Sequence, residues 1–391
     1  LGADRPRAAR YLVAAGDWAR GLYANADAIR SYELALETLA ACSGLEGRAV
    51  EVEERLGDVL APAGRIADAL RHLEAARTAR SQQGDSIGQA RLLRKIAALR
   101  WAGGDRAGAG GCLDDALALI ADEPPHIEHA KLHQELGQRA FRSGDHAAAL
   151  RWTQRAIDDV ERLSALEPEA TADDERERSA AFALALNTQG AALARCDRLD
   201  EAVARLERSG EVAHAADLPQ VECRALSNLG VLYSSRDPQR AIDACERGLQ
   251  TAQRIGDVGL QSRLYANLAV AYCTLTNRCD ERGVGAARSA IDIDRRTGQL
   301  DHLAVSLVVL AQIEQCHGDR ARALAYYREA LALAEASGEA QLLFPCYDGL
   351  ATLCLDDGDD AQAGRWMQLA SATCERAGLD PDALVVLPFL A

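Results

Sequence analysis

The chain has 391 residues, of which 48% are hydrophobic and only 4% aromatic, and its formal net charge is −15 at pH 7. This acidic balance argues against a nucleic-acid partner, for which a basic stripe would be expected. No apolar run reaches the roughly 20 residues that cross a bilayer. The longest run, Leu303 to Ile313, is interrupted by Ser306. We therefore expect no nucleic-acid partner and no membrane span.

Small residues recur about every forty positions, each inside a segment of helical periodicity. In the first helix of each expected pair they are Gly16, Gly57, Ala97, Gly137, Gly190, Gly230, Ala269, Ala311 and Ala351. In the second helix they are Ala28, Ala69, Ala109, Ala149, Ala202, Ala241, Gly283, Ala323 and Ala363. Small side chains are needed where two helices cross closely. The pattern predicts one solenoid over residues 1–391, with units that start near residues 5, 47, 87, 127, 179, 220, 259, 300 and 340.

Two segments depart from the regular spacing. Gly137 and Gly190 are 53 residues apart, whereas the other intervals are 39 to 42 residues. The surplus is acidic and contains Pro168, so we expect a solvated loop insertion at about 164–178. The turn at 276–282 is also lengthened, by about two residues. An insertion at a repeat turn is either tolerated or a contact site, and both alternatives stay open.

The repeat resembles a known family in two segments. Residues 318–331 read GDRARALAYYREAL, and residues 229–233 read LGVLY. These resemble the second and first helix of the tetratricopeptide repeat (TPR), although the period near forty exceeds the usual 34 or so and also suggests HEAT or armadillo repeats. The resemblance implies an all-α, right-handed α-solenoid of about nine TPR-like helical hairpins of a long-repeat type.

No sequence motif indicates catalysis. The chain has no P-loop, no nucleophile-elbow motif and no zinc-protease motif, so we expect neither an enzyme nor a cofactor. The one weak candidate for a metal site is His129 with His133, four residues apart on one helix face next to His126. A helix start that carries imidazoles is the alternative.

The TPR resemblance implies that the first helices line a concave groove. Projected onto this sequence, it places Arg91, Arg94 and Lys131 in the groove of the third and fourth units. They are candidates for a basic pocket that binds an acidic ligand. The alternative is that salt bridges to Glu51 and Glu54 of the second unit neutralise them.

The same projection puts amides and guanidinium groups in the groove of the fifth to eighth units. The candidate ligand-binding residues there are Asn187, Arg224, Asn228, Arg263, Asn267 and Gln312. Asn228 and Asn267 each lie two residues before a small anchor, which resembles the asparagine ladder of kinesin light chains and bacterial peptide-pheromone receptors. That resemblance implies amides that bind the main chain of a peptide. Alternatively, these asparagines satisfy neighbouring helix ends.

The opening segments, 7–19 and 26–32, resemble the start of the TPR region in large bacterial regulators. Those proteins place a signalling ATPase, often with a nucleotide cyclase or a DNA-binding domain, before a C-terminal sensor array. The resemblance implies a protein- or peptide-binding sensor module, with an upstream ATPase or cyclase domain in the same chain as a partner. The alternative is a freestanding scaffold that joins partners or self-associates. Eleven cysteines without C-x-x-C spacing indicate a reducing, cytoplasmic location.

Overall fold

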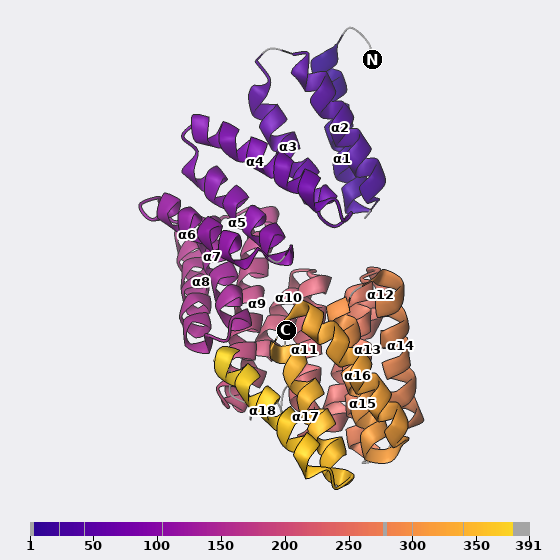
Figure 1. Cartoon of the computed structure of the whole chain (residues 1–391). Helices are drawn as coiled ribbons and strands as arrows, with labels where there is room; N and C mark the ends of the chain where they lie inside the picture. The colour runs from indigo at the N-terminus through magenta and orange to yellow at the C-terminus, as the bar shows by residue number, and fades with distance from the viewer. Residues whose placement is uncertain are drawn as a thin grey trace. The chain divides into compact units, whose positions relative to one another are not determined.

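The computed structural model describes residues 4–22, 24–42, 44–103, 105–276, 280–298, 300–338 and 340–377. In these residues the chain forms eighteen α-helices and no strand, and the helices pair in chain order into antiparallel hairpins (Figure 1). The all-α class and the helical-hairpin architecture are confirmed. The lengthened turn expected at 276–282 lies partly outside the described residues, because 277–279 are not among them.

Nine hairpins make up the described chain. The first helices are α1 (Arg5–Gly21), α3 (Glu46–Leu60), α5 (Ser86–Ala102), α7 (Ile127–Arg142), α9 (Ala172–Arg195), α11 (Pro219–Ser234), α13 (Val258–Thr276), α15 (Leu300–His317) and α17 (Ala340–Asp356). The second helices are α2 (Asn25–Ala40), α4 (Ile66–Gln82), α6 (Arg106–Ile120), α8 (His146–Leu166), α10 (Leu199–Ala215), α12 (Pro238–Arg254), α14 (Glu281–Thr297), α16 (Arg320–Ser337) and α18 (Asp360–Ala377). Every predicted start except 179 lies within one residue of an observed helix start.

The acidic insertion is mostly helical, which corrects the predicted loop at about 164–178. The connection between α8 and α9 spans only residues 167–171, and the two helices have 21 and 24 residues. The helix α9 begins early because Thr171 and Asp174 form a capping box, in which each side chain bonds the backbone of the other. The extra residues therefore lengthen a hairpin.

Contacts divide the chain into two compact units, residues 1–135 and 136–391, where the sequence predicted one continuous solenoid. In the first unit, consecutive helices from α1 to α6 pack against each other. In the second unit the same holds from α8 to α18, and the first helices α9, α11, α13, α15 and α17 also contact one another in turn. No comparable contact joins consecutive second helices among the described residues. The first helices therefore form the tighter, inner face of the second unit.

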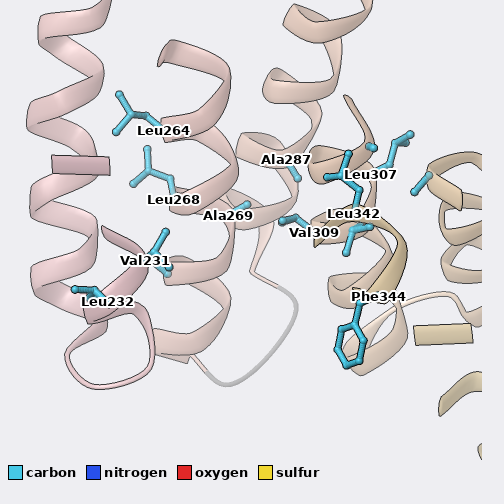
Figure 2. Packing of buried hydrophobic residues seen from close by; sticks show 14 of the residues in the cluster. Val231, Leu232, Leu264, Leu268, Ala269, Ala287, Leu307, Val309, Leu342 and Phe344 are labelled. Atoms are coloured by element: carbon cyan, nitrogen blue, oxygen red, sulfur yellow. The ribbon is translucent and has the colours of Figure 1, made fainter. Parts of the chain in front are cut away.

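Small residues at the helix crossings allow this packing. A Cβ atom on Gly190 would lie 2.7 Å from Leu206, so any larger residue would push α9 and α10 apart. Ala323 in α16 is fully buried at the equivalent crossing with α15. Leucine, valine and alanine side chains from α11, α13, α14, α15 and α17 fill the core of the second unit (Figure 2). No described helix is long and apolar enough to cross a membrane.

Candidate ligand-binding face of the first helices

Two arginines occupy equivalent positions on neighbouring inner helices of the second unit. Arg224 in α11 lies six residues before Gly230, and Arg263 in α13 lies six residues before Ala269. The two helices pack against each other, and the positive charge of Arg224 acts on Arg263. Neither arginine forms an ion pair with a carboxylate in the described part of the chain. Arg224 is exposed, whereas Arg263 is half-buried.

Arg263 has a neutral partner on the next inner helix. Its Nη2 lies 3.1 Å from Nε2 of His302 in α15. Burial, with the positive field of Arg224 and then of Arg142, lowers the pKa of Arg263 to about 10. Burial and the Arg263 charge lower the pKa of His302 to about 4, so at neutral pH the imidazole is uncharged and accepts the hydrogen bond. The Asp257 and Asp294 carboxylates act on Arg263 in the opposite sense but more weakly than the two arginines, so the field at Arg263 is net positive in a strongly acidic protein.

The asparagines form hydrogen bonds between neighbouring inner helices. Asn228 Nδ2 donates to Asn187 Oδ1 at 3.0 Å, which links α11 to α9. Asn267 Nδ2 donates to the carbonyl and the hydroxyl oxygen of Ser227, both at 3.0 Å, which links α13 to α11. All three asparagines are buried, at 5% exposure or less. In this structure their amides bond neighbouring first helices.

The remaining groove candidate in this unit is Gln312 in α15, which is half-buried and has no hydrogen-bond partner among the described residues. His302 and Asp294 are also polar groups of this region, and neither was expected from the repeat pattern. Asp294 in α14 is fully buried, accepts from the Ser306 hydroxyl at 2.8 Å and has a pKa raised by burial. A charged residue at a core position of the pattern is the signal that would have identified it.

In the first unit the predicted basic residues are paired with carboxylates. Arg91 forms a bidentate ion pair with Glu54, in which Nε donates to Oε1 at 2.8 Å and Nη2 donates to Oε2 at 3.1 Å. Arg94 contacts Glu128 in the same way, at 3.1 and 3.2 Å, and Lys131 lies 3.5 Å from Glu128. These attractions hold the pKa of Glu128 below its ordinary value despite its burial. The basic pocket is thus an ion-pair network, and its partners are Glu54 and Glu128.

The histidines cluster at a helix start. Both ring nitrogens of His129 face backbone carbonyls, of His126 at 3.1 Å and of Ile120 at 2.9 Å. His126 Nδ1 accepts from the Glu128 amide at 3.1 Å at the beginning of α7. His133 lies on the same helix. In the described residues no group of three or more histidine, cysteine, aspartate or glutamate side chains is arranged to hold a metal ion.

Comparisons with known proteins show the fold. No protein-family model matches this chain, and no curated protein sequence matches it. It is similar to the solved structure of a Rap protein complexed with competence and sporulation factor, with a TM-score of 0.66 and 11% identity over 95% of this chain and 99% of that one. It is also similar to the apo form of the quorum sensor NprR from B. thuringiensis, with a TM-score of 0.62 and 13% identity over 93% and 98% of the two chains.

A third similar structure is the Rap conjugation gene regulator of the plasmid pLS20 in complex with the Phr* peptide. Its TM-score is 0.60, with 12% identity over 98% of each chain. At this identity the similarity establishes the architecture, an all-α array of TPR-like helical hairpins. These matches span nearly the whole chain, so the array accounts for both units.

Proposed function

We propose that this protein is a non-catalytic module that binds an extended peptide, or an extended segment of a partner protein, along the inner helices of its second unit. The observation that carries the proposal is the pair Arg224 and Arg263, which repeats on adjacent first helices and lacks carboxylate partners there. An extended chain presents carbonyl or carboxylate oxygens at regular intervals. Guanidinium groups bind such oxygens with charge-assisted hydrogen bonds.

Each groove residue has a role in this proposal. Arg224 and Arg263 bind oxygens of the ligand, and Gln312 supplies an amide that can donate and accept along its backbone. His302 keeps the Arg263 guanidinium oriented without neutralising it. Asn187, Asn228 and Asn267 fix the spacing of the inner helices. A direct clamp by the asparagines would require Asn228 to release Asn187.

The similar structures support a peptide as the ligand. Two of the three were solved with a bound peptide or signalling factor, the Phr* peptide and the competence and sporulation factor. The third is a quorum sensor. These are properties of those proteins, and the shared architecture makes the same ligand class the first to test for this chain.

The finer proposal is that the module senses its ligand for a larger cytoplasmic bacterial regulator, with an ATPase or cyclase domain in the same chain. The first hairpin supports it through the resemblance of residues 7–19 and 26–32. A freestanding scaffold is the alternative. The native gene distinguishes the two, because a nucleotide-binding motif encoded before Leu1 is expected only for the regulator.

The test is a selection from a library of short, unstructured peptides with the full chain as bait. Affinity for the selected peptides is then measured for the Arg224→Gln/Arg263→Gln double variant. Loss of a charge-assisted hydrogen bond should cost roughly 1.5–3 kcal/mol of binding free energy for each arginine. The matched control is Arg288→Gln/Arg328→Gln, which removes two exposed arginines from the second helices α14 and α16. Equal affinity of both double variants would contradict the proposed site.

A further inference from the structure

A second basic site lies away from the inner arginines, between two second helices of the same unit. An open surface pocket of about 470 Å³ is bounded by α8, α9 and α10. Its lining includes Arg151 and Arg155 from α8, Arg205 from α10 and Arg198 at the start of α10, with Glu201 as its single acidic residue. We call it the outer basic pocket. Its volume is in the range typical of small-molecule sites.

Much of the positive charge in this pocket is uncompensated. Arg198 pairs with Glu201 at 2.7 Å, and Arg155 stacks over Trp152 with its guanidinium carbon 4.7 Å from the ring centroid. Arg151 and Arg205 are exposed and have neither a hydrogen bond nor an ion pair in the described part of the chain. Two guanidinium groups are therefore available to one ligand in a protein of net charge −15.

The floor of the pocket carries a buried acceptor without a donor. Gln189 of α9 is only 5% exposed, and its Nε2 donates to Gln154 Oε1 at 3.1 Å. The amide of Gln154 is oriented by Asp158, which accepts from its Nε2 at 2.8 Å. This chain of bonds fixes the Gln189 amide and leaves its Oε1 without a hydrogen-bond partner. Buried acceptors are rarely left unsatisfied. This oxygen has almost no accessible surface, so a neighbouring side chain must move before a ligand hydroxyl can donate to it, and the hydrogen bond gained offsets that movement.

We propose that the outer basic pocket binds a small hydroxylated oxyanion, such as a phosphorylated sugar or a hydroxylated polycarboxylate. Arg151 and Arg205 bind the oxyanion, and Gln189 Oε1 accepts from the neighbouring hydroxyl. The proposal is independent of the groove, because none of these residues lies on α11, α13 or α15. The protein then has a second binding site, for a small molecule, in addition to its peptide-binding face.

The test is calorimetric titration of the full chain at low ionic strength with ribose 5-phosphate, citrate and sulfate. Ribose 5-phosphate and citrate carry both an oxyanion and a hydroxyl, whereas sulfate has no hydroxyl to donate. We expect saturable binding of at least one hydroxylated probe, and binding of sulfate at least several-fold weaker. Whether ribose 5-phosphate or citrate binds more tightly distinguishes a phosphate from a carboxylate ligand.

Variants locate the binding. Arg151→Gln/Arg205→Gln should weaken binding of the probe about a hundredfold, because each of the two lost charge-assisted bonds removes about a factor of ten. Arg288→Gln/Arg328→Gln removes the same charge from exposed positions on other second helices and should leave the affinity unchanged. Gln189→Met should abolish the preference for a hydroxylated probe over sulfate. The proposal is overturned if no probe saturates at millimolar concentration, or if the Arg151/Arg205 variant binds like the wild type.

Discussion

The inner helices of the two units differ in how their basic residues are paired. In the first unit, Arg91 and Arg94 each face a buried carboxylate on an adjacent first helix. In the second unit, Arg263 bonds a neutral histidine and lies in the positive field of Arg224. Basic residues on an inner face can thus hold helices together or remain available to a ligand. Whether a basic residue is paired or remains available depends on the residue type that the neighbouring first helix places beside it.

The largest effect is expected from Glu128→Gln in the first unit. Glu128 is 2% exposed, and the variant leaves the Arg94 guanidinium without its carboxylate partner. Loss of one partner of a buried pair should cost about 3 kcal/mol of unfolding free energy, measured by urea denaturation. Asp68→Asn, in an exposed ion pair of the same unit, is the matched control and should change the stability little. Similar losses for both variants would show that the buried network adds no special stability.

The next effect concerns helix crossing in the second unit. Ala323→Leu adds three carbon atoms at a position with no exposed surface. Overpacking should cost about 1–3 kcal/mol. Hydrogen exchange should accelerate first in α15 and α16, because coupling in a repeat array is between neighbours. Arg328→Leu, at an exposed position of the same helix, is the control. Unchanged exchange in Ala323→Leu would mean that the repeat phase is wrong.

A third prediction distinguishes a structural role of the asparagines, which is to link the inner helices, from direct binding of a peptide. Asn228→Ala leaves the buried Asn187 oxygen without its donor, so the free energy of unfolding should fall by about 1–3 kcal/mol. Asn267→Ala should act similarly through Ser227. Chemical denaturation and titration of a selected peptide are measured on the same samples. A variant that keeps full stability and loses peptide affinity would establish the direct clamp instead.

The pH dependence should distinguish the units. His302 has a folded-state pKa of about 4, below its ordinary 6.5. Between these values the unfolded chain binds more protons, so stability falls as pH falls from 6.5 to 4, by roughly 3 kcal/mol. Glu128 has a lowered pKa, so its contribution is lost only at lower pH, as its folded-state pKa is passed. His302→Gln should flatten the unfolding free energy between pH 6.5 and 4. An unchanged slope would refute this assignment.

The smallest stability change is expected for Arg224→Gln/Arg263→Gln. These arginines repel each other and lack carboxylate partners, so their removal should change the unfolding free energy by no more than about 1 kcal/mol. Thermal denaturation measures this. A large loss of stability would show that the arginines support the fold, in the manner of Arg91 and Arg94.

The sequence predicted the helix pairs well because their signal is local. Small residues at crossings and capping residues at turns lie within one hairpin, so eight of nine starts were placed within one residue. The start of α9 was missed because acidic composition was weighted above the capping box at Thr171 and Asp174. Side-chain pairing was harder to predict, since Arg94 meets a carboxylate 34 residues away and Arg263 meets His302 39 residues away. The outer basic pocket was not anticipated, because its arginines look like ordinary surface charges.

Photo-crosslinking tests the central claim most directly. A selected peptide carrying a benzophenone group is crosslinked to the full chain, and the attachment sites are read by mass spectrometry. The account predicts attachment on the inner helices α11, α13 and α15, and its loss in Arg224→Gln/Arg263→Gln. Attachment confined to α3 and α5 of the first unit, or to the second helices, would contradict it.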